Sequence, residues 1–198
     1  MKFYNKIKWI LGILIVFVLI ITTNLVDKNN FTRVRDAVVT IYEDRLIAKD
    51  LIFEMLKAVH EKEVAVALSD SLFFLQENDK INNDVQSLIS RYEQTKLTSE
   101  ESSVFEDLKD NFQSLKIAEG SYIASYPKDE NNLVEQISEV KENLSELSKI
   151  QLNEGRRQMS ISKKALETVE LFTHIEIYLL IFLAIIIQII IMYNPKKK

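Results

Sequence analysis

The sequence predicts an all-α, two-pass membrane protein, and three observations carry that prediction. Only three glycines and two prolines occur in 198 residues, which is unlike a turn-rich β protein. Apolar runs lie near both ends, at 9–26 and 176–193. Between them, apolar residues recur at helical spacing. We therefore expect an extracytoplasmic antiparallel four-helix bundle over 27–175, continuous with both transmembrane helices.

Both apolar runs approach the roughly 20 residues that a helix needs to cross a bilayer. No clear small-x-small cleavage site follows the first run, which favours an uncleaved anchor over a signal peptide. Three lysines lie in the short N-terminus 1–8 and three in the basic tail 194–198, so the positive-inside rule predicts that both termini are cytoplasmic. Subtracting these six lysines from the 25 basic residues leaves 19 against 29 acids. The acidic middle region belongs outside the inner membrane, and its charge argues against nucleic acid as a partner.

The first bundle helix is predicted from heptads that begin at residue 31, and we expect it to continue from the first span. One heptad position holds Phe31, Val38, Ile52, Val59, Val66 and Phe73, and the other holds Val34, Ile41, Ala48 and Met55. The turn after this helix lies within 69–80. The run 76–80 has the stronger loop composition, whereas a turn at 69–71 gives better matched helix lengths, so both alternatives stay open.

Three more helices follow, which gives the even number that a chain leaving and re-entering the membrane on one side requires. A capping box, Thr98-Ser99-Glu100-Glu101, predicts the start of the third helix. Pro127 predicts its end, and Asn131 or Asn132 begins the fourth helix. The expected core residues of these helices are Ile81, Val85, Leu88, Ile89 and Tyr92; Val104, Phe105, Leu108, Phe112, Leu115 and Ile117; and Leu133, Ile137, Val140, Leu144, Leu147, Ile161, Ala165 and Phe172.

The sequence offers little for catalysis or cofactor binding. It has no cysteine, which excludes disulfides and thiolate metal sites, and no nucleophile, phosphate-loop or zincin motif, so we expect no enzyme, cofactor or metal site. His60 and His174 are the two histidines, and neither lies three residues after a glutamate as in di-iron bundles. Gln188 lies in the second span and is a candidate for a hydrogen bond between membrane helices.

Two segments resemble the four-helix-bundle sensor domain of bacterial methyl-accepting chemotaxis receptors. The first is Ile41-Tyr42-Glu43-Asp44-Arg45-Leu46, and the second is Arg91-Tyr92-Glu93-Gln94-Thr95-Lys96-Leu97-Thr98, followed by Glu101 and Phe105. The resemblance implies a homodimeric sensor that passes piston or rotation movements along its first and last helices. The chain ends five residues after the second span, so we expect output to pass to another membrane or cytoplasmic signalling protein.

Arg45 is the first candidate for a ligand-binding residue because it occupies a core heptad position. If the membrane edges at 26 and 177 are level, Arg45 faces Gln158 and Lys49 faces Glu154, in a polar layer that also includes Gln151. This layer is either an anion site, with Arg91 as a further candidate, or a register-setting layer of the kind found in coiled coils. Gly155 is a candidate hinge.

Two functions stay open from the sequence. The first is a sensor whose bundle binds a small molecule or a periplasmic protein and relays the signal through its first and last helices. The second is a structural or interaction protein that assembles through its bundle and binds no small ligand.

Overall fold

The computed structural model describes residues 3–125 and 130–192, and within these ranges it contains helices and no strand. The elements are α1 (Phe3–Thr40), the π-helix η1 (Ile41–Leu46), α2 (Ile47–Ala67), α3 (Ser71–Gln76), α4 (Asn78–Glu93), α5 (Ser99–Ser125) and α6 (Glu130–Met192). They divide into two compact units, Val39–Gln158 and the pair of segments Met1–Val38 and Met159–Lys198. The all-helical prediction is confirmed, whereas the bundle limits 27–175 stay a prediction.

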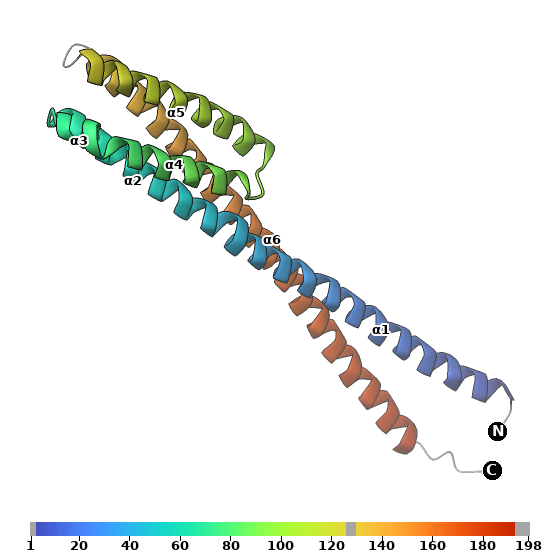
Figure 1. Cartoon of the computed structure of the whole chain (residues 1–198). Helices are drawn as coiled ribbons and strands as arrows, with labels where there is room; N and C mark the ends of the chain where they lie inside the picture. Colours follow the sequence, from blue (N-terminus) through green and yellow to red (C-terminus); the bar gives the residue numbers. More distant parts are fainter. Residues whose placement is uncertain (1–2, 126–129, 193–198) are drawn as a thin grey trace, which may run out of the picture. The chain divides into compact units, whose positions relative to one another are not determined.

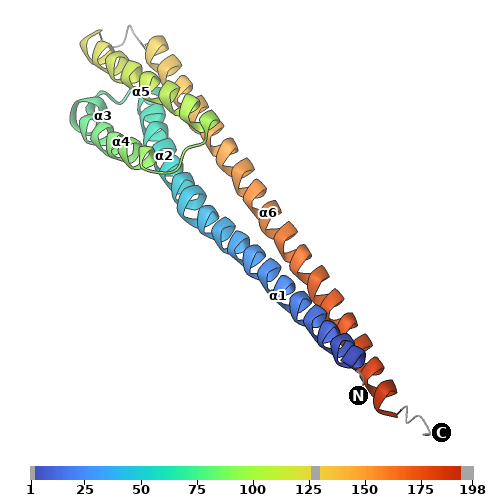
Figure 2. The ribbon, with the colours of Figure 1, turned by 90° about the vertical axis from the view of Figure 1, so that its right-hand side faces the viewer.

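In the unit Val39–Gln158, α2, α4, α5 and the first part of α6 lie side by side around one apolar core (Figures 1 and 2). Edge-to-face or tilted aromatic pairs tie neighbouring helices together, including Tyr92 with Phe105 and Phe74 with Tyr122. Most of the predicted core positions are buried, among them Ile52, Val59, Val66, Ala48, Met55, Val85, Ile89, Tyr92, Val104, Phe105, Leu108, Phe112, Leu115, Leu133, Ile137, Val140, Leu144 and Leu147.

The heptad prediction is wrong at three positions. Phe31 and Val38 were expected in the core but are 71 % and 54 % exposed, and Ile117 is exposed while its neighbour Ala118 is buried. For the first two residues the reason is η1, because a π turn contains one more residue than an α turn and so changes which face of the helix is buried.

The turn after α2 lies at 68–70, which is close to the predicted alternative at 69–71. Ser69 takes the left-handed backbone conformation, with φ of 52°, and the Asp70 side chain accepts a hydrogen bond from the Phe73 amide to begin α3. The run 76–80 holds only a break between α3 and α4, because Asn78 is buried and hydrogen-bonded inside the bundle. Loop composition was therefore misleading here.

The predicted start of the third helix is confirmed, since the Thr98 hydroxyl accepts from the Glu101 amide at 3.2 Å and the Thr98 amide donates to Glu101 Oε2 at 2.7 Å. The fourth helix begins at Glu130, one or two residues before the predicted start at Asn131 or Asn132. The predicted stop at Pro127 lies at 126–129, outside the described residues.

Two helical stretches are long and apolar enough to cross a membrane, Leu14–Ala67 and Glu130–Ile186. The protein itself covers only 6 % and 0 % of their most apolar windows, so these side chains are available to lipid. Among the residues of this second unit whose burial the structure describes, the buried side chains are small or polar, namely Asn30, Ala37, Ser162 and Ala165. Gln188 is exposed, and a partner for it stays a prediction.

Candidate functional site

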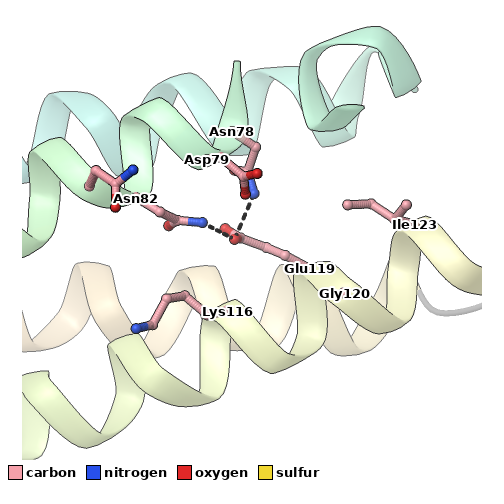
Figure 3. A pocket seen from close by; sticks show the side chains of 8 residues that line it. Asn78, Asp79, Asn82, Lys116, Glu119, Gly120 and Ile123 are labelled. Carbon is pink, nitrogen blue, oxygen red and sulfur yellow. Dashed lines mark hydrogen bonds between the residues drawn. The ribbon is translucent and has the colours of Figure 1, made fainter. Parts of the chain in front are cut away.

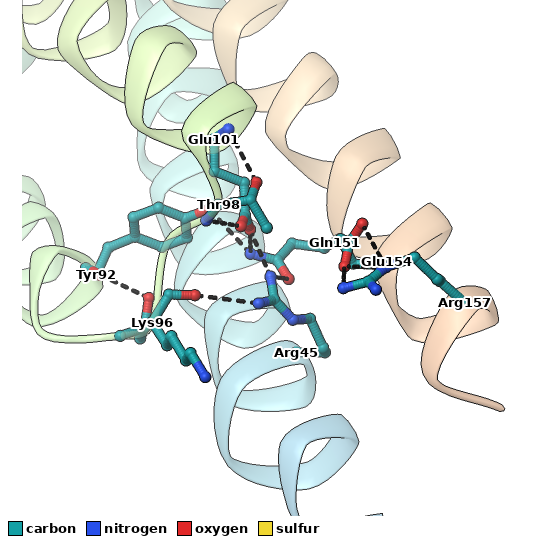
Figure 4. A network of polar contacts seen from close by, with 9 residues as sticks. Arg45, Tyr92, Lys96, Thr98, Glu101, Gln151, Glu154 and Arg157 are labelled. Carbon is teal, nitrogen blue, oxygen red and sulfur yellow. Dashed lines mark hydrogen bonds and ion pairs between the residues drawn. The ribbon is translucent and has the colours of Figure 1, made fainter. Parts of the chain in front are cut away.

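A buried cluster of polar side chains surrounds Arg45 (Figure 4). We call Arg45, Tyr92, Glu101 and Gln151 the Arg45 cluster. Arg45 is 6 % exposed, and its guanidinium donates from Nη1 to Glu101 Oε1 at 2.7 Å and to Gln151 Oε1 at 3.1 Å. Its Nη2 donates to the backbone carbonyl of Lys96 at 3.0 Å. One side chain from η1 therefore contacts α5, α6 and the turn that follows α4.

The two carboxylate oxygens of Glu101 make different contacts in this cluster. Its Oε2 accepts the Thr98 amide and so caps α5, while its Oε1 accepts hydrogen bonds from Arg45 and from the Gln151 amide group. The side chain has no exposed surface, so both carboxylate oxygens must be satisfied inside the protein. The start of α5 and the position of Arg45 consequently depend on the same carboxylate.

Gln151 extends the cluster to α4 by donating to the Tyr92 hydroxyl at 3.0 Å. Burial of Tyr92 raises the pKa of its phenol to about 12, because the phenolate would lose its hydration. The nearby Glu101 carboxylate also raises that pKa, whereas the hydrogen bond from Gln151 and the charge of Arg45 lower it. The phenol therefore stays neutral at physiological pH and serves as a hydrogen-bond acceptor for Gln151.

The cluster joins helices and leaves no free positive charge for an anion. Glu101 balances the charge of Arg45 within a buried ion pair, and an incoming carboxylate or phosphate would have to displace it. The cluster instead connects η1, which follows α1, directly to α6. Both Arg45 and Gln151 lie in the unit Val39–Gln158, so this connection is made inside the bundle.

The predicted partners of Arg45 and Lys49 are wrong. Arg45 contacts Gln151, one heptad before Gln158, and Glu154 pairs with Arg157 on its own helix at 2.7 Å. Arginine and glutamine side chains are long enough to contact residues more than one helical turn away along a neighbouring helix. An apolar run also locates the edge of the membrane only to within about one turn. Counting from the edges therefore identifies a partner only to within about a heptad.

The remaining predicted ligand residues do not converge on the cluster. Lys49 and Arg91 are exposed, and Gln158 is half-buried. Lys49 lies on the outer face of α2 and lines a shallow hollow of about 570 Å³ together with Tyr42, Leu46, Ile47, Asp50 and Phe53. An added Cβ at Gly155 would meet nothing within 4 Å, so close packing does not require glycine there. Ligand binding at these positions and a hinge at Gly155 stay predictions.

A second buried cluster, the Lys62 cluster, consists of Lys62, Asn78, Asn82 and Glu119. The Lys62 ammonium donates to Glu119 Oε1 at 2.6 Å, to Asn82 Oδ1 at 3.1 Å and to Asn78 Oδ1. Both asparagine amides donate to Glu119 Oε2, as Figure 3 shows. Burial lowers the pKa of Lys62, and the Glu119 carboxylate opposes that shift. A hollow of about 390 Å³ between α4 and α5 borders this cluster.

Sequence reasoning missed Glu101 as an ion-pair partner and missed the whole Lys62 cluster, although heptad spacing contains a signal for each. Lys62 lies seven residues after Met55, and Glu119 lies seven after Phe112, so both charges occupy core positions. Buried charges require partners, so two such residues on different helices predict one another. Together the two clusters form separate polar layers in the apolar core, which set helix register in bundles.

Comparison with known protein families gives a match over most of the chain. The model of a protein family described as a four helix bundle sensory module for signal transduction matches residues 1–166. No curated protein and no solved structure matches the chain.

Proposed function

Because the chain belongs to the family of four-helix-bundle sensory modules for signal transduction, we propose that it is a membrane-anchored sensor that relays signals through its first and last helices to a partner protein. The family is one of sensory modules and not of catalysts. The observation that carries the proposed relay is the contact of Arg45 with Gln151 across a buried cluster. A stimulus that moves α6 changes the hydrogen bond between Gln151 and Arg45 of η1. A movement of η1 likewise changes that hydrogen bond to α6.

The proposed topology is a two-pass protein of the cytoplasmic membrane, with residues 27–175 outside and both termini inside. The exposed apolar windows of the two candidate spans and the lysines that flank them support it. Thiol labelling in intact cells tests the topology, because the natural chain lacks cysteine. A cysteine at the exposed position Leu72 in α3 should react with a membrane-impermeant maleimide in intact cells. Reaction only after cell lysis would contradict the topology.

A homodimer is the proposed assembly. Tyr42, Leu46 and Phe53 are large apolar side chains that are each more than half exposed, and they follow one another along η1 and α2. Such an exposed apolar row suits a self-complementary contact with a second copy of the chain. Replacing Leu46 and Phe53 by glutamate should shift the detergent-solubilised chain from dimer to monomer in light scattering, whereas an unchanged mass would exclude this face.

A structural or interaction role is the second candidate, and the Arg45 cluster gives a specific reason to keep it. Glu101 balances the charge of Arg45, so the cluster has no unpaired charge for a small anion, and Arg45 Nε is a buried donor without a hydrogen-bond partner. In this alternative the two polar layers fix helix register for assembly, and the chain binds no small ligand.

A thermal-shift screen of the full chain in lipid nanodiscs separates the two functions. The panel contains amino acids, organic acids, metal ions and periplasmic extract. We expect a ligand to raise the melting temperature and to change the labelling rate of a cysteine at Thr173, on the part of α6 that carries the second candidate span. If no compound raises the melting temperature and a stable membrane partner is recovered in pulldown, the structural role is favoured and the ligand-sensor proposal is contradicted.

A further inference from the structure

The seven-residue spacing of the buried positions along α1, η1 and α2 is interrupted by one extra residue at η1. Asn30 and Ala37 are buried on α1, at 4 % and 3 % exposure, and Arg45, Ile52 and Val59 are buried after α1 ends. Successive members of this series are seven residues apart, except that eight separate Ala37 from Arg45. A π turn accommodates one more residue than an α turn, so Ile41–Leu46 accounts for the extra residue.

The apolar pattern of the sequence corresponds to a different register. Phe31 and Val38 precede Ile52 and Val59 in one series of heptads, with Arg45 in the same series. This series would form a single buried line if α-helix continued through 41–46. In the structure, Phe31 and Val38 are instead mostly exposed, so the chain adopts a register that its apolar residues do not favour.

Unpaired polar atoms mark the cost of the observed register. Asn30 Nδ2 and Asp27 Oδ1 are buried without a hydrogen-bond partner. A buried donor or acceptor without a partner loses the hydration that it has in the unfolded chain. Movement of the buried line by one residue would release Asn30 toward solvent and bury Phe31 and Val38 in its place.

The Arg45 cluster is compatible with both registers. Arg45, Ile52 and Val59 keep their seven-residue spacing whether 41–46 is π-helical or α-helical, so the bonds of Arg45 to Glu101 and Gln151 need not break. These bonds hold the segment after η1 in place. A change of register at η1 therefore alters the buried face of α1, by one residue or about 100° around the helix axis.

We propose that Ile41–Leu46 is a two-state element that exchanges between the observed π register, which buries Asn30 and Ala37, and an α register, which buries Phe31 and Val38. Both registers use the same core contacts of α2 and differ in which side chains α1 presents. A two-state element of this kind lets a small change in free energy select one of two discrete helix faces.

Single-cysteine labelling of the full chain in lipid nanodiscs tests the exchange. The sequence has no natural cysteine, so Ala37→Cys and Val38→Cys report the two faces separately. The π register protects position 37 and exposes position 38. Asn30→Leu should favour the π register by placing an apolar side chain at the buried position, while Asn29→Leu is the matched control because Asn29 is exposed.

We expect the cysteine at 37 to react with maleimide at least about tenfold more slowly in the Asn30→Leu background than in the natural background, with no change in Asn29→Leu. A tenfold change in an opening equilibrium corresponds to 1.4 kcal/mol. Equal protection in all three backgrounds would overturn the proposal, since it would mean that only one register is populated.

Deletion of Glu43, whose side chain is exposed, provides the reverse test by removing the extra residue of η1. The relative labelling rates should invert, so that the cysteine at position 37 reacts quickly with maleimide and the cysteine at position 38 reacts slowly. A chain that keeps its helical circular dichroism but also keeps the original order would contradict the two-register proposal. If the deletion abolishes folding, the Asn30→Leu comparison decides by itself.

Discussion

Single charged side chains in the core have the largest predicted effects on this bundle. Arg45 and Glu101 form a buried ion pair at 2.7 Å, and Lys62 and Glu119 form another at 2.6 Å. Removal of one partner from such a pair leaves an uncompensated charge, whereas removal of both partners is often close to neutral. These residues therefore act in pairs, and single substitutions exaggerate what each pair contributes.

A double-mutant cycle on Arg45 and Glu101 measures that coupling. Arg45→Leu and Glu101→Gln should each lower the free energy of unfolding by about 3–5 kcal/mol. The double variant should recover much of this loss, because no buried charge is left over. The control is Arg157→Leu, which removes an exposed pair with Glu154 and should cost at most about 1 kcal/mol in denaturant titration. Additive losses in the double variant would show that the two side chains act independently.

Tyr92 gives the bundle a distinctive alkaline response. Its pKa is raised to about 12 in the folded protein, whereas the unfolded phenol titrates near its ordinary value of 10.0. Between these values the folded state binds the extra proton, so stability present below pH 10 is lost as the pH rises toward 12. The loss attributable to Tyr92 should be on the order of 2–3 kcal/mol. Urea titrations across this range should show a shallower decline for Tyr92→Phe, and identical slopes would contradict the assignment.

At the scale of elements, sequence patterns located the helices well and misjudged their faces. The capping box predicted the start of α5 because its signal is local, requiring only Thr98 and Glu101. Phe31 and Val38 were misplaced because a π-helix leaves no mark in apolar periodicity. Asn78 was misread as a loop residue because its burial depends on Lys62 and Glu119, which are distant in sequence. The burial of Asn78 follows from contacts with residues distant in sequence, and local composition does not reveal such contacts.

Helix propensity predicts the effect of replacing two glycines. An added Cβ at Gly120 in α5 or at Gly155 in α6 meets no atom within 4 Å. Gly120→Ala and Gly155→Ala should therefore each raise the free energy of unfolding by about 0.5–1 kcal/mol. Chemical denaturation measures the gain. A loss at Gly155 alone would indicate that the helix needs glycine flexibility there, as the hinge prediction requires.

At the scale of the whole molecule, the sequence identified the class of protein more securely than its site. Composition, apolar runs and heptads predicted helices and two candidate spans, and the family match supports a sensory module. The site was predicted only in part. Arg45 and Gln151 were recognised as polar interruptions of the apolar seam, but their mutual contact and the role of Glu101 depend on helix register. Register arises from the packing of several helices and is poorly encoded in any one of them.

We expect the Arg45 cluster to couple the segment after α1 to α6, and hydrogen–deuterium exchange of the full chain in nanodiscs measures this coupling. The comparison is between the natural chain and the Arg45→Leu, Glu101→Gln double variant, which removes the ion pair without stranding a charge. We expect faster exchange in both 41–52 and 147–158, while residues 78–85 beside the Lys62 cluster stay unchanged. Faster exchange confined to one of the two helices would contradict the coupling.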